Sequence, residues 1–371
     1  MEYKIYSDYV DVTFYVISTE GKNLIKIINF SLLIKKMFLS EIGEFGFINR
    51  LSEKFKNITI PPELGIGDDC AIIPKDDTHD YVVTTDMLVE NIHFIHSKIT
   101  PFELGYKTLA VNISDIAAMG AKPLYSFLSV AIPVSIEVEY LDQLLEGYKH
   151  ISEKYNVLLM GGDTTRSEKN LTLSVTVIGI IEKNKARLRS MAQKDDIICV
   201  TGFLGDSGAG LKIILDNIPL SDEVEYLLKC HNCPEPAVNE GIWLANQAGV
   251  NAMMDISDGI ASDLKHILKA SQKSAVIELN NLPISPQLQS VANKYGFNVI
   301  EHASSSGEDY KLLLTVAKNR FSDISKEFKN KFGNDLFAIG NIIENNSENI
   351  FWQKNGMKID EFKRGYNHFT N

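Results

Sequence analysis

The 371 residues, 44% hydrophobic and 23% charged, fit two globular domains and argue against extensive disorder. The formal net charge of −11 argues against nucleic acid and anionic membrane surfaces as partners. The four cysteines predict no disulfide framework, and no apolar run reaches the roughly 18 residues of a membrane span, so we expect a cytoplasmic protein.

In chain order, residues 1–36 stand apart as a mixture of strand-like and amphipathic pieces, before a fresh start at Met37. We treat them as an N-terminal extension without an assigned fold. From residue 66 onward, short β-rich runs alternate with helical stretches, a pattern typical of α/β layers. A charged segment at 183–195 places the domain boundary, which gives domains of residues 37–185 and 186–371.

The first domain contains a well-marked helix over residues 101–119. Thr100 is placed to cap it, with Pro101 at the first helical position and Glu103 completing a capping box. Gly120 follows where a helix commonly ends. Both ends of this helix are therefore predicted.

A second helix is predicted over 137–155, with an apolar stripe that we expect to lie on a sheet. The stripe consists of Leu141, Leu145, Tyr148 and Tyr155. The second domain is expected to contain strands at 196–202, 251–255, 275–279, 310–316 and 336–342, and helices at 206–216, 237–248, 259–269 and near 321–332.

Acidic residues recur where β-rich runs appear to end in turns of Gly, Thr or Ser. The motifs carry Asp68 and Asp69, Asp86, Asp163, and Asp255 with Asp258. Any one of them is explained as well by turn formation or helix capping. Clustered carboxylates, however, cost several kcal/mol each unless a cation offsets them, and hard oxygen ligands suit Mg²⁺. Asp115 adds to the set, because an anion near the C-terminal end of a helix is disfavoured by the macrodipole.

Features that would hold phosphate accompany these acids. Residues 201–214 combine a strand, a Gly-rich turn and a helix, a layout that points backbone N–H groups at an anion, although tight packing explains the glycines equally well. No Walker A motif is present in the sequence. Gly161 and Gly162 permit close approach of a ligand beside Asp163. Arg166, Arg187 and Arg189 are candidates for phosphate contacts, with solvated arginines as the alternative.

Covalent catalysis has no support in the sequence. His93 and His96 lack a nearby nucleophilic Cys or GxSxG turn. Cys230 and Cys233 have CxxC spacing without further ligands, so two ordinary thiols are the preferred interpretation. The residues together indicate phosphoryl transfer, in which catalysis is mostly positioning and charge neutralisation.

Taken together, the motifs resemble thiamine-monophosphate kinase, a family of the superfamily that includes aminoimidazole ribonucleotide synthetase and selenophosphate synthetase. The resemblance runs from about Met37 to the end and is carried, in order, by "GEFGFINRL", "GIGDDCAII", "TTDMLVENIHF", "YKTLAVNISDIAAMGAKP", "GGDTTRS", "VTGFLGDSGAGL", "DISDGIASDLKHI", "SGEDYKLLLTV" and "KRGYNHF". It implies ATP-dependent phosphorylation of thiamine monophosphate to thiamine diphosphate by direct in-line transfer, with several Mg²⁺ ions.

The resemblance also implies the site residues. The magnesium shell would comprise Asp69, Thr84, Thr85, Asp86, Asp115, Asp163, Asp255 and Asp258, of which Asp69, Asp255 and Asp258 are the catalytic candidates. Nucleotide contacts would come from Gly162, Asp163, Arg189 and Ser257, and substrate contacts from His93, Glu308 and Tyr366.

The fold implied is α/β (α+β) with two domains, in which N-terminal-domain strands of a homodimer build a shared barrel. Two departures from the family pattern are residues 1–36, which have no counterpart, and Ser306, which stands where Gly is usual. Two alternatives stay open: another ATP-using member of the superfamily, or a non-catalytic dimer that binds nucleotide or metal.

Overall fold

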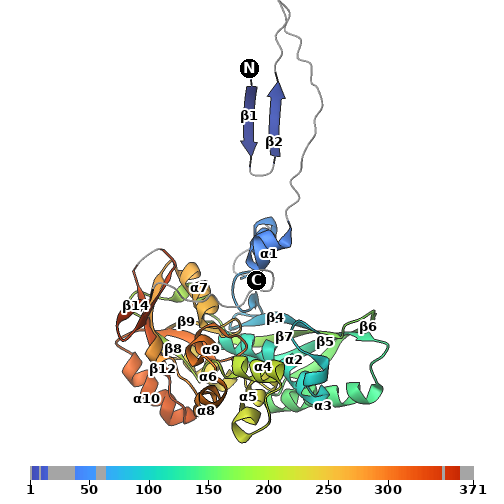
Figure 1. The fold of residues 1–371 in the computed structure, drawn as a ribbon. Helices are drawn as coiled ribbons and strands as arrows, with labels where there is room; N and C mark the ends of the chain where they lie inside the picture. Colours follow the sequence, from blue (N-terminus) through green and yellow to red (C-terminus); the bar gives the residue numbers. More distant parts are fainter. Residues whose placement is uncertain (1, 8–9, 16–37, 56–63, 345–346, 360–371) are drawn as a thin grey trace, which may run out of the picture. The chain divides into compact units, whose positions relative to one another are not determined.

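The computed structural model describes residues 2–7, 10–15, 38–55, 64–344 and 347–359 (Figure 1). The chain divides into two compact units, residues 1–54 with 367–371 and residues 55–366. The first unit contains an antiparallel hairpin of β1 (Glu2–Ser7) and β2 (Val10–Tyr15) and most of α1 (Leu39–Phe55), which is interrupted at Gly43. The rest of the predicted extension and Tyr366 lie outside the described residues.

A five-stranded sheet forms one half of the second unit. Its order is β3 (Ala71–Pro74), β4 (His79–Val89), β7 (Thr172–Glu182), β5 (Lys122–Pro133) and β6 (Leu158–Ser167). All neighbours pair antiparallel except β5 and β6, which run parallel. Alternate residues of β7 are buried, because one face of the sheet packs on helices and the other does not. Both helices of this half, α2 and α3, cover the same face (Figure 1).

Helix α2 (Pro101–Ala118) is the central element of the unit and confirms the first helix prediction. Thr100 and Glu103 form the expected capping box. The helix is buried almost all round, since it packs on β4 and β7 on one side and on α6 and β9 of the other half. Most side chains on α2 therefore face a water-poor interior.

Helix α3 (Val138–Tyr155) confirms the second prediction in extent but not in its buried face. The buried side chains are Leu144, Tyr148 and Ile151, whereas Leu145 is 48% exposed. The predicted stripe was wrong by part of a turn because α3 packs mainly on α2, not on the sheet.

Glycines set the close approach of α2 and α3. A Cβ added to Gly105 would lie 1.8 Å from the Leu144 carbonyl oxygen. We expect Gly105→Ala to lower the free energy of unfolding by about 3 kcal/mol, the upper end for overpacking, because neither backbone can yield. Urea unfolding measures this, with Gly161→Ala as control, since the nearest atom to that added Cβ is 3.8 Å away. Equal midpoints for the two variants would contradict the packing described.

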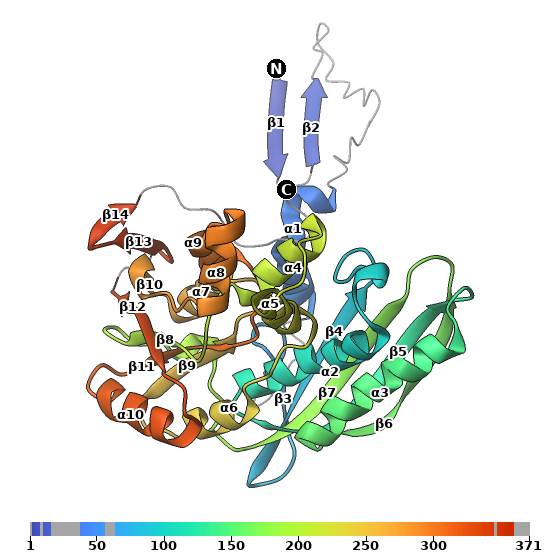
Figure 2. The same ribbon diagram turned by 60° about the horizontal axis from the view of Figure 1, so that its bottom comes forward.

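A seven-stranded sheet forms the other half (Figure 2). Its order is β14 (Met357–Ile359), β13 (Ile350–Lys354), β10 (Ser274–Glu278), β12 (Phe337–Ile343), β8 (Ile197–Val200), β11 (Leu312–Val316) and β9 (Val250–Asp255). Its helices are α4 (Asp206–Asp216), α5 (Asp222–Asn232), α6 (Val238–Ala245), α7 (Ile260–Ser271), α8 (Pro286–Tyr295), α9 (Val299–Ser305) and α10 (Phe321–Phe332). Every strand and helix predicted for this half is present, and α5, α8, α9, β13 and β14 were not predicted. None of the described helices is long and apolar enough to cross a bilayer.

Candidate functional site

Three carboxylates from distant parts of the sequence meet between the two sheets. One oxygen each of Asp69, Asp115 and Asp255 lies within 4.8 Å of the other two. Asp69 belongs to the turn before β3, Asp115 to the central helix α2, and Asp255 is the last residue of β9. The acids of separate motifs thus form one cluster, here called the acid cluster.

Hydroxyl groups orient two members of the acid cluster. Thr84 Oγ1 donates a hydrogen bond to Asp115 Oδ2 at 2.5 Å, and Ser114 Oγ donates to Asp255 Oδ2 at 2.6 Å. Thr85 points to the other face of β4, where its hydroxyl donates to the Val175 carbonyl at 3.1 Å. Its side chain therefore takes no part in the acid cluster.

Asp86 lies beside the acid cluster, in the middle of β4 and not at the predicted strand end. Its backbone N–H donates to Asn112 Oδ1 at 3.0 Å, and its carboxylate is near enough to that of Asp115 to raise the Asp115 pKa. The pair Thr84 and Asp86 shares one face of the strand because side chains alternate. The turn assigned to this motif was therefore wrong, because Asp86 lies inside a strand.

Burial disfavours the ionised form of the carboxylates in the acid cluster. It raises the pKa of Asp255 to about 8, with the neighbouring Asp69 adding to the effect. Burial likewise raises the pKa of Asp86 to about 6 and that of Asp115 well above its usual range, and Asp86 and Asp255 reinforce the rise at Asp115. Asp69 Oδ2 is buried and has no hydrogen-bond partner among the residues that the structure describes. An orphaned oxygen among mutually repelling carboxylates fits a divalent cation with oxygen ligands such as Mg²⁺.

Arg189 partly offsets this negative charge. Its Nη2 donates to Asp69 Oδ1 at 2.6 Å, and its backbone N–H donates to Asp68 Oδ2 at 3.1 Å. Burial opposes the charged guanidinium, but Asp69 and Asp68 outweigh it and raise the Arg189 pKa. The pKa of Asp68 rises to about 7, chiefly through burial. Arg189, which was predicted to contact nucleotide, thus lies at the acid cluster, where a phosphate group would compete with Asp69 for its guanidinium group.

The loop after β9 holds Ser257 and Asp258 next to the acid cluster. The Asp258 backbone N–H donates to Asp263 Oδ2 at 3.1 Å, in the first turn of α7. The Ser257 carbonyl accepts the Glu308 N–H at 2.7 Å, so a second loop braces the first. Asp263 is 1% exposed and was not predicted. Its position five residues after Asp258 at a helix start was the available signal.

Two of the predicted substrate residues are described: Glu308 lies on this second loop, and His93 lies in the segment that follows β4. Glu308 Oε2 is 3.0 Å from Lys107 Nζ and 3.3 Å from His231 Nδ1. His93 Nδ1 accepts the Val89 N–H at 3.0 Å, and the charge of His93 acts on Glu308. Lys107 and His231 were not predicted. A lysine within a largely apolar helix was the signal for the first.

Gly162 and Asp163 lie apart from these residues within one chain. They belong to β6, an edge strand whose residues are exposed, and not to a strand-end turn as predicted. Two strands separate β6 from β4, a distance of about 14 Å at the usual strand spacing. A Cβ on Gly162 would meet the Leu128 carbonyl oxygen of β5 at 1.7 Å, which explains this glycine by packing alone.

The backbone N–H groups of the Gly-rich turn at 201–214 do bind a carboxyl group, but it is that of a residue of this same chain, Asp309. Asp309 accepts the Gly205 N–H at 2.7 Å and the Ser207 N–H at 3.3 Å at the start of α4. Arg187 is likewise structural, because its Nε donates to the Ala245 carbonyl at 3.0 Å. Neither feature is therefore available to phosphate in this structure.

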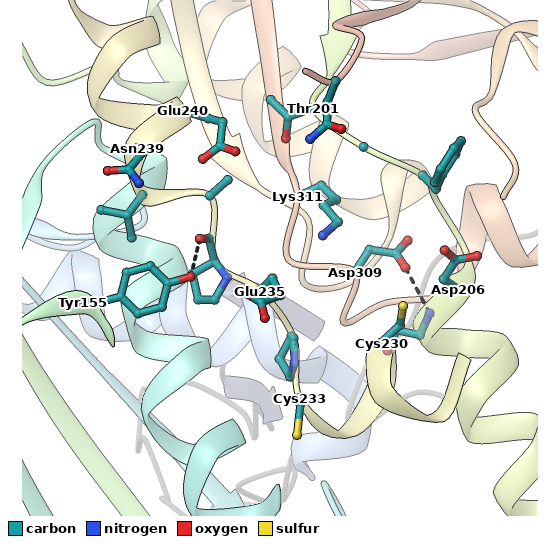
Figure 3. Close-up of a pocket in the computed structure, with 18 of the residues that line it drawn as sticks. Tyr155, Thr201, Asp206, Cys230, Cys233, Glu235, Asn239, Glu240, Asp309 and Lys311 are labelled. Carbon is teal, nitrogen blue, oxygen red and sulfur yellow. Dashed lines mark hydrogen bonds between the residues drawn. The ribbon is translucent and has the colours of Figure 1, made fainter. Parts of the chain in front are cut away.

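A cavity of about 1000 Å³ lies on the Asp309 side of this segment (Figure 3). Its wall includes Lys311, Cys230 and Cys233, and none of the acid cluster. Burial raises the pKa of Cys230 to about 11 and that of Cys233 to about 12, so both are thiols at neutral pH. Among the described residues, neither cysteine joins a cluster of three or more metal-ligand side chains. The interpretation as two ordinary thiols stays a prediction.

Comparisons with known proteins place these features in context. Residues 67–181 match the model of the AIR synthase related protein N-terminal domain, and residues 195–353 match that of its C-terminal domain. The thiamine-monophosphate kinase of Buchnera aphidicola (Acyrthosiphon pisum) is 40% identical over 88% of this chain and 98% of its own. That of Escherichia coli K12 is 35% identical over 88% and 98%. A solved complex of AaThiL with AMPPCP and TMP superposes with a TM-score of 0.79 at 31% identity, covering 90% of this chain and 99% of that one.

Proposed function

Because the chain belongs to the thiamine-monophosphate kinase family, we propose that it transfers the terminal phosphoryl group of ATP to thiamine monophosphate, giving thiamine diphosphate. The observation that carries this proposal is the acid cluster, in which Asp69, Asp115 and Asp255 converge from three elements. The AaThiL complex with AMPPCP and TMP supports it, because nearly the whole of that chain is covered. An acid cluster without a nucleophile matches direct transfer, which needs positioning and charge neutralisation.

We propose Mg²⁺ as the metal. Its ligands would be drawn from Asp69, Thr84, Thr85, Asp86, Asp115, Asp163, Asp255 and Asp258, with Thr85 limited to its backbone. When bound, Mg²⁺ draws the phosphate oxygens to the site and neutralises their charge. Asp69, Asp255 and Asp258 would hold the metal-bound phosphates at the reacting end. Thr84 and Ser114 keep the carboxylates of Asp115 and Asp255 in place through their hydroxyl groups.

The remaining proposed contacts divide between nucleotide and substrate. Arg189 and Ser257 lie at the acid cluster and would bind the nucleotide phosphates. Arg189 would then give up its hydrogen bond to Asp69 and donate to phosphate oxygens. His93 and Glu308 would receive thiamine monophosphate, and Tyr366 would stack on its ring. Burial opposes the ionisation of Glu308, but the charge of Lys107 and the hydrogen bond from its Nζ outweigh it and lower the Glu308 pKa, so Glu308 is ionised at neutral pH.

A homodimer would complete the site. None of the described strands pairs with the outer edge of β6, and this strand exposes Leu158, Leu159 and Met160, the type of edge that a second copy covers. Gly162 and Asp163 would then act as nucleotide contacts from this dimer edge. We also propose a domain boundary between residues 185 and 186, and a cytoplasmic location.

A turnover assay with ATP, Mg²⁺ and thiamine monophosphate tests the function. We expect thiamine diphosphate and ADP in equal amounts, and no product when Mg²⁺ is removed. ATP binding without thiamine diphosphate would favour the non-catalytic alternative. Phosphoryl transfer from ATP to a different acceptor would favour another member of the superfamily.

A further inference from the structure

Lys107 is a completely buried lysine on the central helix α2. Its Nζ lies 3.0 Å from Glu308 Oε2. An ammonium group in a water-poor interior is strongly unfavourable unless a carboxylate pairs with it. The position of Lys107 is therefore tied to that of Glu308, a residue 201 positions later in the chain.

His231 reaches the same carboxylate oxygen from helix α5. Its Nδ1 is 3.3 Å from Glu308 Oε2 and 3.0 Å from Ser207 Oγ. Burial, followed by the charge of Lys107, lowers the His231 pKa to about 3, so the imidazole is neutral at physiological pH. The hydrogen-bond partner of His231 Nδ1 is Ser207 Oγ, so the imidazole packs against Glu308 Oε2 while Lys107 donates the hydrogen bond to that oxygen. Side chains of two helices thus enclose one oxygen of Glu308.

The other oxygen of Glu308 remains accessible. Glu308 Oε1 accepts no hydrogen bond from any described residue, and the side chain is 25% exposed. The backbone at Glu308 has φ 64, a left-handed conformation that non-glycine residues rarely adopt. The bonds from the Glu308 N–H to Ser257 and from the Tyr310 N–H to Ile256 hold it there. The carboxylate is therefore fixed from both its backbone and its Oε2 side.

We propose that Lys107 and His231 are positioning residues: Lys107 holds Glu308 ionised and His231 packs against Oε2, so that Oε1 is turned toward the substrate and the site selects a ring bearing an N–H donor or positive charge. The inference rests on the proposed function, because it concerns the acceptor side of that site. A carboxylate whose second oxygen is already bonded has no freedom to turn away. Substrate recognition then needs no reordering of Glu308 on binding.

Calorimetric titration of the full chain with thiamine monophosphate tests the proposal. We expect Lys107→Met to raise the Kd and KM for thiamine monophosphate at least tenfold and the KM for ATP less than twofold. The control is Lys183→Met, which breaks the Lys183–Asp80 ion pair of 2.6 Å on the five-stranded sheet and should change neither constant. We expect His231→Asn, which keeps a polar group for Ser207 near the Nδ1 position, to bind better than His231→Leu.

The pH profile separates positioning from a merely structural role. The ionisable groups acting on Glu308 are Lys107, His231, His93 and Tyr310. Without Lys107 the effect of burial dominates, so the Glu308 pKa rises and its charge is lost as the pH falls. The affinity of Lys107→Met for thiamine monophosphate should therefore fall more steeply with decreasing pH than that of the wild type.

The outcomes are distinguishable. A wild type that does not bind thiamine monophosphate overturns the proposed function and this inference with it. A binding-competent wild type with an unchanged Lys107→Met affinity and pH profile overturns the inference alone. If Lys107→Met fails to fold, Lys107→Met/Glu308→Gln, which leaves no unpaired buried charge, is compared with Glu308→Gln. Equally weak binding by these two supports the proposal, and a further loss in the double variant contradicts it.

Discussion

Asp255→Asn is expected to lower kcat by at least about 10³-fold, because it removes a carboxylate from the acid cluster where transition-state charge must be neutralised. The fold should survive. At neutral pH without metal, the Asp255 carboxyl is largely protonated, since burial raises its pKa to about 8. The amide oxygen of Asn can still accept the Ser114 hydroxyl that Asp255 accepts at 2.6 Å. Steady-state kinetics and thermal unfolding of the same preparations measure both parts.

Asp206→Asn is the matched control for Asp255→Asn. Asp206 is also buried and also accepts a hydroxyl, that of Ser285 at 2.6 Å, but it lies outside the acid cluster. We expect its kcat to stay within about threefold of the wild type. Equal losses of kcat in the two variants, or an Asp255→Asn variant that retains full turnover, would show that the acid cluster is not where catalysis occurs.

Removal of divalent metal is expected to make stability strongly dependent on pH. The folded-state pKa values of Asp68, about 7, and Asp255, about 8, lie above the usual value of 3.8. The folded state therefore binds more protons than the unfolded state, so stability falls as the pH rises from about 4 to 8. Between pH 6 and 8 the loss should be about 2 kcal/mol or more, since one pKa unit corresponds to about 1.4 kcal/mol.

Adding Mg²⁺ should reverse this loss. A cation bound to the ionised carboxylates stabilises only the folded state, by about 2.7 kcal/mol at a concentration a hundred times its Kd. Urea unfolding at pH 6 and pH 8, with EDTA or with Mg²⁺, measures the effect, and NaCl of equal ionic strength is the control. We expect Mg²⁺ to stabilise more at pH 8 than at pH 6. A pH dependence that is identical with and without Mg²⁺ would contradict the metal assignment.

Local signals predicted the elements that position the site. The capping residues at Thr100 and Glu103 predicted the start of α2, and the apolar run before Asp255 predicted β9. The α/β (α+β) architecture of two halves is confirmed by the structure and by the two matched domain models. These predictions succeeded because caps and periodicity act over a few residues.

Features that depend on long-range packing were not predictable in this way. Asp86 and Asp163 were assigned to turns because Thr and Gly precede them, yet both lie inside long strands whose neighbours supply the hydrogen bonds. The partner of Gly205 and Ser207 is Asp309, about a hundred residues away, so no local pattern could show that the anion is internal. The same holds for the pairing of Lys107 with Glu308.

The central claim is that Asp69, Asp115 and Asp255 together hold divalent metal against the phosphates of ATP. A crystal structure with AMPPCP and Mn²⁺ tests it most directly, because the anomalous signal locates each ion. The account predicts at least one ion coordinated by oxygens of these three residues and by a phosphate oxygen of the nucleotide. A bound nucleotide whose metal lies elsewhere, with the three carboxylates uncoordinated, would contradict it.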